Sequence, residues 1–418
     1  MTSEPTEAFV WVWLPGAEEP VVAGRLDVVG DLAAFTYGRS YLERDERMAL
    51  YLPELPLRRG RIMPLVGTIA GCIADAGPDA WGQRVILNHR VGRSAEDTAE
   101  LSPLTYLLDS GSDRIGALDF QASPTEYVPR SRGEAQLSEL TRLAESAQKV
   151  EEGIPLSPAL DQALLHGSSV GGARPKVLLK DGTRRLIAKF SSITDTFPIV
   201  KAEFVGMELA RRAGIDTAAI ELTEALGKDV LLVERFDRPA SEGRRAQVSA
   251  LTILGLDEWG GRYASYEALA DQVRERFTEP KATLHELFSR LTFNILSGNT
   301  DDHARNHAAF WNGAELTLTP AYDICPLPRA GGEASQAMAI GRDGYRLSQV
   351  AACVARASTY LLSEEEARKI VDRQIKTIER EWDDVCELAS LSEVDRRRLW
   401  RGAVLNPYAT EGYSSRSS

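Results

Sequence analysis

A short polar segment, residues 298–307, carries the side chains best suited to chemistry, and it reads GNTDDHARNH. Asp301 and Asn306 lie five residues apart in this segment. An aspartate in such a loop can orient a hydroxyl group and accept its proton. An asparagine at that spacing can bind magnesium, which prefers hard oxygen ligands. The pair therefore indicates phosphoryl transfer, with Asp301 as the proton acceptor and Asn306 as a metal ligand.

A second metal ligand is predicted further along the chain, at Asp323. Residues 308–311 and 315–319 are two strand-like runs around Asn312-Gly313, which indicates a hairpin. The hairpin leads to Asp323. Kinase chemistry uses a metal-binding aspartate in this order, after the catalytic loop, so Asp323 is expected to hold magnesium with Asn306.

The same polar segment allows other interpretations. An aspartate or asparagine in a loop is most often a turn or capping residue. His303 and His307 lie four residues apart among carboxylates and would bind zinc in a metallohydrolase if they shared one face of a helix. Because Gly298-Asn299-Thr300 before them is typical of a turn, zinc binding ranks second to phosphoryl transfer.

The elements upstream supply further parts of a nucleotide site. Residues 175–180 and 185–190 are strand-like runs around Asp181-Gly182, which predicts a hairpin that carries Lys189. A helix with an apolar face follows and carries Glu203. Lys189 can contact ATP phosphates and Glu203 can form an ion pair with it, as the lysine and glutamate of kinases do.

Two other segments fit the same site. The loop Ser169-Val170-Gly171-Gly172-Ala173 precedes the hairpin, where it can approach the phosphates of ATP. A strand over 229–236 ends at Glu234 and Phe236, where a hinge would expose backbone groups to adenine. Each feature alone has an ordinary structural explanation, such as a strand lysine, a solvated helix charge or the end of a strand. Their order along the chain predicts the nucleotide site.

The rest of the sequence divides the chain into three parts and a tail. Strand-like runs separated by Gly, Pro and Asp predict a small β-rich part over 1–125. A mixed sheet is expected over 126–240 and a helical part over 241–410. In the helical part, an apolar stripe closed by Gly298 leads into the catalytic loop. Residues 411–418 are small and polar and are expected to be disordered.

Composition excludes several classes of protein. With 418 residues, 43% hydrophobic and 26% charged, the chain is predicted to be globular and to contain more than one domain. A net charge of −12 argues against binding nucleic acid by bulk neutralisation of phosphates. The four cysteines form no CxxC pair, the N-terminus does not resemble a signal peptide, and no apolar stretch is long enough to span a membrane. A cytoplasmic protein is expected.

Taken together, the motifs resemble the HipA family of serine/threonine-protein kinase toxins. The resemblance covers nearly the whole chain, and its most specific part is the catalytic-loop motif at 300–306. The other segments that carry it are 79–84, 115–118, 169–176, 234–238 and 321–323. It implies an α+β, protein-kinase-like two-lobed fold with a small N-terminal β subdomain and a helical C-terminal lobe.

The resemblance also implies ATP and Mg²⁺ as cofactors and assigns roles to single residues. Asp301 becomes the catalytic aspartate, and Asn306 and Asp323 become the magnesium ligands. The ATP contacts that it implies are Ser169, Val170, Gly171, Gly172, Ala173, Lys189, Glu234, Phe236 and His303. Ser169 falls where family members autophosphorylate, although Ser168 beside it is an alternative. Asp302 stands where Gly or another small residue is common in the family. Unlike Asp323, it is expected to have no matching partner with which to hold magnesium.

A toxin of a type II toxin–antitoxin pair is the function that the resemblance implies. Such a toxin binds a small helix-turn-helix antitoxin, similar to HipB, that holds operator DNA, so its own contact with DNA is indirect. Its substrate is a protein, and glutamyl-tRNA synthetase is among those of the family. A small-molecule phosphotransferase on the same scaffold and a non-catalytic protein that binds partners remain as alternatives.

Overall fold

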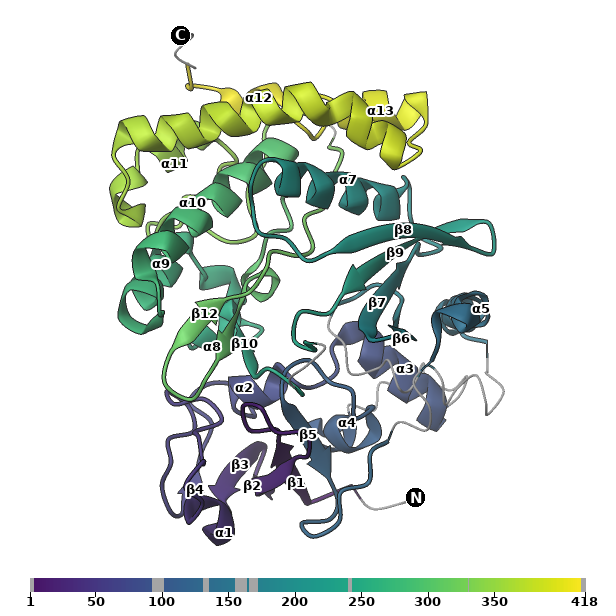
Figure 1. The fold of residues 1–418 in the computed structure, drawn as a ribbon, viewed down its shortest axis with the longest axis vertical. Helices are drawn as coiled ribbons and strands as arrows, with labels where there is room; N and C mark the ends of the chain where they lie inside the picture. Colours follow the sequence, from purple (N-terminus) through teal and green to yellow (C-terminus); the bar gives the residue numbers. More distant parts are fainter. Residues whose placement is uncertain are drawn as a thin grey trace. The chain divides into compact units, whose positions relative to one another are not determined.

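The computed structural model describes residues 4–91, 101–130, 135–154, 164, 172–239, 243–329 and 331–414 (Figure 1). The chain forms two compact units. Unit 1 comprises Met1–Thr194, Thr223–Val248 and Phe310–Ala314. Unit 2 comprises Asp195–Leu222, Ser249–Ala309 and Glu315–Ser418.

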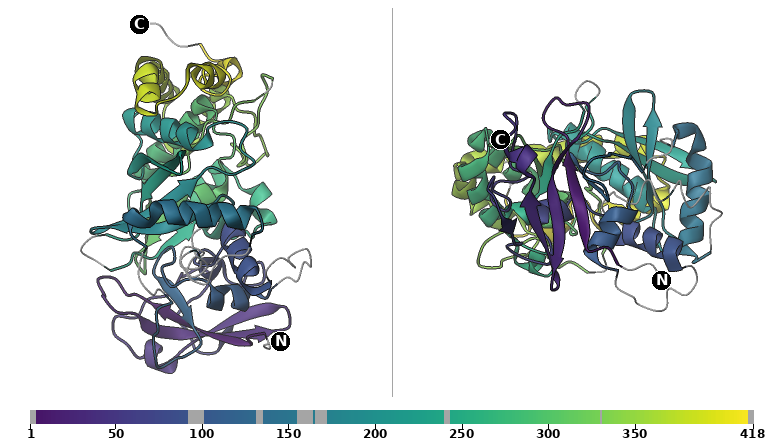
Figure 2. Two further views of the ribbon diagram at one scale, coloured as in Figure 1. Left: turned by 90° about the vertical axis from the view of Figure 1, so that its right-hand side faces the viewer. Right: turned by 90° about the horizontal axis from the view of Figure 1, so that it is seen from below.

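Unit 1 begins with an antiparallel sheet of five strands, in the order β4-β3-β2-β1-β5, whose long strands run side by side in Figure 2. Its strands are β1 (Glu7–Val12), β2 (Val21–Val29), β3 (Leu32–Tyr37), β4 (Arg61–Ile62) and β5 (Leu118–Gln121). Apolar side chains such as Val10, Leu26 and Phe120 are fully buried. Removing their apolar surface from water stabilises the folded sheet. The predicted strands of the β-rich part are therefore present.

A second sheet in unit 1 has the order β6-β7-β9-β8. Its strands are β6 (Lys176–Asp181), β7 (Arg184–Phe190), β8 (Ile220–Ala225) and β9 (Lys228–Glu234). The predicted hairpin around Asp181-Gly182 joins β6 to β7, with Gly182 in the left-handed region at φ 58°. Helices α3 (Ala80–Val91) and α5 (Leu140–Glu151) contribute apolar side chains to a core shared with β6, β7 and β9.

Unit 2 is built around helix α10 (Pro280–Ser297), from which nearly every side chain after Thr283 is buried. It packs against α9 (Tyr266–Arg276) and α12 (Glu364–Leu388), and α12 also packs against α7 (Ile199–Arg212) (Figure 1). Ser363 and Glu366 form a capping box at the start of α12. Within the described ranges, no helix combines the length and the apolar character needed to cross a membrane.

The remaining elements are shorter. A three-stranded sheet has the order β10-β11-β12, and Asn312-Gly313 lies between β11 and β12 as expected, with the Ala314 N–H donating to Asn312 Oδ1 at 2.9 Å. The three strands are β10 (Gln247–Ser249), β11 (Ala308–Trp311) and β12 (Leu316–Leu318). The other α-helices of the described residues are α1 (Arg39–Leu42), α2 (Gly71–Ala74), α4 (Pro103–Asp109), α8 (Ala250–Ile253), α11 (Val350–Val354) and α13 (Glu393–Leu399).

Candidate active site

The candidate catalytic loop starts where α10 ends, at Gly298. This residue has φ 76°, a left-handed conformation that glycine adopts without steric cost. A Cβ atom at Gly298 would lie 2.5 Å from the backbone oxygen of Ala403, so no larger residue fits. The Gly298 oxygen accepts a hydrogen bond from the Leu327 N–H at 3.1 Å. The helix therefore ends at a defined point and gives the loop a fixed origin.

Hydrogen bonds hold the first half of the loop on two sides. The buried side chain of Asn299 donates to Asn294 Oδ1 at 3.0 Å, and its backbone oxygen accepts from Gln336 Nε2 at 2.9 Å. Residues 337 and 338 donate their backbone N–H groups to the oxygens of residues 300 and 302, at 2.9 and 3.1 Å. Backbone hydrogen bonds on either side of Asp301, to residues 337 and 338, therefore hold this part of the loop in the way that a neighbouring strand would.

Asn306 is tied to Asp301 through the backbone. Its Nδ2 donates to the Asp301 backbone oxygen at 3.1 Å, and its N–H donates to the His303 oxygen at 2.8 Å. Because the amide nitrogen is used in this way, the amide oxygen is the atom that can coordinate a cation. Residues 304–306 form a single 3₁₀ turn, so His303 and His307 do not share the face of an α-helix that the zinc alternative requires.

The carboxylate of Asp301 is exposed, and no hydrogen bond or ion pair holds it among the residues that the structure describes. Partial loss of solvent raises its pKa above the usual value, and the nearby carboxylates of Asp323 and Asp302 raise it further. His303 acts in the opposite direction. Asp301 is therefore an accessible carboxylate with a raised proton affinity, which suits a proton acceptor.

Asp323 lies in a strained part of the backbone. Its φ is 61°, a conformation that costs a residue other than glycine free energy and that is often found at functional sites. Just before it, Ala321 donates its N–H to the Asp216 oxygen at 2.7 Å, and the Tyr322 hydroxyl donates to the Arg305 oxygen at 2.7 Å. These bonds fix the segment that carries Asp323 and link it to the catalytic loop.

The donor set suits magnesium better than zinc. Among the described residues, no group of three or more His, Cys, Asp or Glu side chains is arranged to hold a metal ion. The two predicted ligands, Asn306 and Asp323, would provide oxygen donors. Magnesium usually keeps several waters and takes one or two protein oxygens together with phosphate oxygens, so two protein ligands are enough. In such a site the ion would neutralise charge on the phosphates of ATP.

Asp302 has two hydrogen-bonding partners that the sequence did not indicate. The side chain is only 1% exposed, and Tyr266 donates its hydroxyl hydrogen to Oδ2. Oδ1 lies 2.9 Å from His307 Nε2, and the Tyr266 hydroxyl lies 3.1 Å from the same nitrogen. Burial and the charge of Asp302 raise the pKa of Tyr266, which therefore stays a proton donor. Asp302 therefore supports the loop from its buried side, whereas Asp301 is exposed to solvent.

Sequence reasoning missed the two residues that complete this support. Tyr266 opens helix α9, 36 positions before Asp302, and Asn294 on α10 reaches the Tyr266 hydroxyl at 3.4 Å. No local motif joins residues so far apart. The only available signal was a polar residue, Asn294, inside the otherwise apolar stripe of α10.

Comparison with known proteins identifies the family of the chain. The family model described as "HipA-like C-terminal domain" matches residues 168–382, more than half of the chain and including the candidate catalytic loop. The chain belongs to the HipA-like family. Y4mE of Sinorhizobium fredii, named as a candidate kinase, is 27% identical over 320 residues, which are 71% of this chain and 72% of that protein.

HipA of Shewanella oneidensis provides two further comparisons, one of sequence and one of structure. The serine/threonine-protein kinase toxin HipA is 25% identical over 184 residues, which are 37% of this chain and 42% of that protein, so the match spans less than half of its length. A solved complex of HipA, HipB and operator DNA contains a chain with a TM-score of 0.69, 19% identity, and coverage of 96% of this chain and 95% of that one. This likeness shows that the HipA-like chain has the α+β, kinase-like fold expected from its sequence.

In unit 1, the HipA-like chain places two of the predicted nucleotide residues on one sheet. Lys189 is on β7, between Lys176 of β6 and Leu231 of β9. Glu234 ends β9, and its Oε2 lies 3.3 Å from Arg184 Nε. Phe236 packs edge-on against Phe310, with ring centroids 5.8 Å apart. Glu203 is buried on α7 of unit 2. The proposed ATP contacts of these residues remain predictions.

The predicted phosphate-binding loop is described only at its end. Ser168, Ser169, Val170 and Gly171 lie outside the described residues. Gly172 has φ 110°, which requires glycine, and its oxygen accepts from the Trp81 N–H at 3.2 Å. The indole of Trp81 donates to the Lys176 oxygen at 3.0 Å. The motif at 79–84 therefore contacts the end of the predicted loop at Gly172 and the start of β6 at Lys176.

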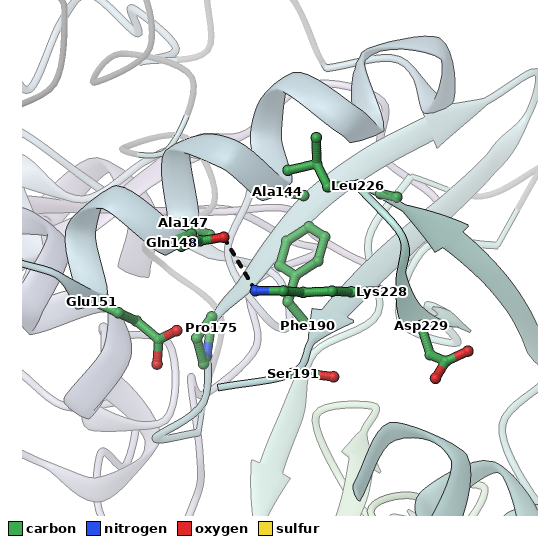
Figure 3. Close-up of a pocket in the computed structure, with 11 residues that line it drawn as sticks. Ala144, Ala147, Gln148, Glu151, Pro175, Phe190, Ser191, Leu226, Lys228 and Asp229 are labelled. Atoms are coloured by element: carbon green, nitrogen blue, oxygen red, sulfur yellow. Dashed lines mark hydrogen bonds between the residues drawn. The ribbon is translucent and has the colours of Figure 1, made fainter. Parts of the chain in front are cut away.

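Unit 1 also contains a pocket beside α5. Side chains of α5, the end of β7 and the turn before β9 line it, and Lys228 Nζ lies 3.1 Å from Gln148 Oε1 across it (Figure 3). Phe190 lines it, but its neighbour Lys189 does not, and neither does Glu234. Of the predicted nucleotide contacts that the structure describes, none lines the pocket.

Proposed function

We propose that this HipA-like chain is an ATP-dependent serine/threonine protein kinase and the toxin of a type II toxin–antitoxin pair. The observation that carries the proposal is the pairing of Asp301 and Asn306, in which the amide is bonded to the Asp301 backbone and the Asp301 carboxylate stays accessible. The kinase and toxin names of its relatives support the same activity.

In this proposal Asp301 orients a protein hydroxyl group and accepts its proton. Asn306 and Asp323 hold Mg²⁺ on the ATP phosphates, and Lys189, paired with Glu203, contacts the same phosphates. The loop Ser169–Ala173 covers the phosphates, His303 contacts ATP, and the backbone at Glu234 and Phe236 binds adenine. Ser169 is proposed as an autophosphorylation site.

A HipB-like antitoxin with a helix-turn-helix fold is the proposed partner. The HipA of similar fold was solved together with HipB and operator DNA, which supports this choice. The net charge of −12 agrees with contact with DNA through the antitoxin rather than directly. The proposed place of action is the cytoplasm, and the proposed substrate is a protein such as glutamyl-tRNA synthetase.

Transfer of labelled phosphate from ATP tests the proposal. Wild-type protein with Mg²⁺ should label itself, purified glutamyl-tRNA synthetase or another protein of a bacterial lysate, whereas Asp301→Asn should label none. Mass spectrometry should locate the phosphate on Ser169 rather than Ser168. Label that appears only on small molecules would favour the small-molecule phosphotransferase. Tight ATP binding without any transfer would favour a non-catalytic protein.

A further inference from the structure

A buried cluster of charges in unit 1 joins the end of β9 to the N-terminal sheet. Asp113, on the loop before β5, forms ion pairs with Arg235 at 3.0 Å and Arg238 at 3.1 Å. Asp237 forms ion pairs with the same two arginines, each at 2.8 Å. It also accepts from the Gly116 N–H at 2.8 Å. Two acidic and two basic side chains thus form a network of ion pairs.

The arginines also bind backbone oxygens of the loop. Arg235 donates from Nη2 to the Arg114 oxygen at 2.6 Å and from Nη1 to the Asp113 oxygen at 3.3 Å. Arg238 donates from Nη1 to the Gly116 oxygen at 2.8 Å. Residues 113–116 and 235–238 are therefore one hydrogen-bonded assembly, although more than a hundred residues separate them in sequence.

The cluster is ionic despite its burial. Loss of solvent would raise the pKa of Asp113 and Asp237, but the neighbouring arginines lower both below the usual value. Each carboxylate is therefore charged at neutral pH. Removing one charge would leave its buried partners uncompensated, which is strongly unfavourable. Such a network permits little movement of the backbone that carries it.

The backbone that the cluster holds is the predicted adenine hinge. Arg235 and Asp237 are the two chain neighbours of Phe236, and both are almost fully buried. The Arg235 N–H also donates to the Arg185 oxygen on β7 at 2.8 Å. Because both neighbours of Phe236 are fixed, the peptide groups between Glu234 and Asp237 keep one position.

We infer that Asp113 is a positioning residue for the nucleotide, because through Arg235 and Arg238 it holds the backbone of residues 234–236 that receives adenine. The inference rests on the proposed function and gives the N-terminal sheet a part in ATP binding. Asp113 itself touches no substrate. Because small misplacements of binding groups can have large effects on reactivity and affinity, loosening the hinge should weaken ATP binding.

Asp113→Asn tests the inference, since it keeps the size of the side chain and removes its charge. We expect the Kd of MgATP to rise roughly ten- to a hundred-fold, with phosphoryl transfer at saturating ATP close to that of the wild type. Hydrogen exchange of the amides at 234–238 should become faster. Asp113→Glu should recover part of the ATP affinity.

Glu54→Gln is the matched control. Glu54 is 5% exposed in the same N-terminal part, and it accepts hydrogen bonds from the Gly71 and Cys72 N–H groups, each at 2.8 Å. It should lower the Tm without changing ATP affinity or exchange at 234–238. An equal loss of ATP affinity in both variants, or none in Asp113→Asn, would overturn the inference.

The wild-type protein provides a test that does not depend on the folding of a variant. Saturating MgATP should slow exchange of the Gly116 amide, which is bonded to Asp237, more than exchange of the Gly71 amide, which is bonded to Glu54. Equal effects on the two amides would contradict the coupling, even if the protein is an active kinase. Absence of any ATP binding would instead refute the proposed function, and with it the role of Asp113.

Discussion

The candidate catalytic loop and the charge cluster of unit 1 use aspartate in opposite ways. In the cluster, arginines surround Asp113 and Asp237 and lower the pKa of both. In the loop, the pKa of Asp301 is raised by partial loss of solvent and by other carboxylates. A neutralised aspartate stabilises the fold, whereas one with neighbouring negative charges remains available to a proton or a cation.

The same contrast recurs within the loop, between adjacent residues. Asp302 is buried against Tyr266 and His307, and Asp301 is exposed without a hydrogen-bonded partner among the described residues. Because the two residues differ only in surroundings, the environment of each carboxylate predicts which variant loses activity and which loses stability.

The largest expected effect is on catalysis by Asp301→Asn. Phosphoryl transfer should fall by about 10²- to 10⁴-fold, the usual contribution of a general base. The Tm should stay within a few degrees of the wild type, because the carboxylate supports no other side chain. Single-turnover transfer and thermal unfolding would measure the two effects. Near-normal turnover would remove Asp301 from the mechanism.

Asp323→Ala should act mainly on magnesium. We expect the magnesium-dependent part of ATP affinity to fall by about 10- to 100-fold, since the ion would lose a ligand. Asp302→Ala is the control. It should reduce the magnesium-dependent part of ATP affinity less, because the Asp302 carboxylate contacts Tyr266 and His307. ATP titrations with and without Mg²⁺ would compare them. Equal losses would mean that Asp323 does not bind the ion.

Asp302→Ala should instead lower the free energy of unfolding. It leaves the buried Tyr266 hydroxyl and His307 without their acceptor, which costs about 1–3 kcal/mol. The same substitution at Asp301 should cost far less, so the two adjacent variants form a matched pair. Urea unfolding would measure both. A stable Asp302→Ala protein would show that the buried network does not support the loop.

The smallest expected effect is the loss of stability in Gly227→Ala. Comparing it with Gly298→Ala separates the cost of backbone strain from that of steric crowding. Gly298 and Gly227 have similar φ values, 76° and 69°. A Cβ at Gly227 would meet no atom within 4 Å, whereas one at Gly298 would lie 2.5 Å from the Ala403 oxygen. Gly227→Ala should cost about 1–2 kcal/mol through its conformation alone. Gly298→Ala should cost more and also reduce transfer, and identical losses in stability would argue against crowding.

Local features of the fold were predictable from the sequence. The Asp-Gly and Asn-Gly hairpins, the capping box at Ser363 and the end of α10 at Gly298 each depend on residues within a few positions of one another. The spacing of Asp301 and Asn306 is equally local, and the hydrogen bond between them follows from it.

Long-range contacts were not predictable in this way. The partner of Asp302, Tyr266, lies on another helix, and the arginine partners of Asp113 follow it by more than a hundred residues. Nothing in either local sequence distinguishes a carboxylate with a distant partner from one without. For that reason neither the buried partners of Asp302 nor the charge cluster was foreseen.

The crowding at Gly298 has a consequence for the order of synthesis. The start of the loop rests on Ala403, and the Leu405 N–H donates to the Leu296 oxygen at 2.7 Å in the last turn of α10. A ribosome makes these supports long after it has made every proposed catalytic residue. A nascent or prematurely terminated chain that ends before Ala403 contains Asp301, Asn306 and Asp323 but not the backbone on which their loop rests. Translation must therefore pass Leu405 before the loop has its complete support.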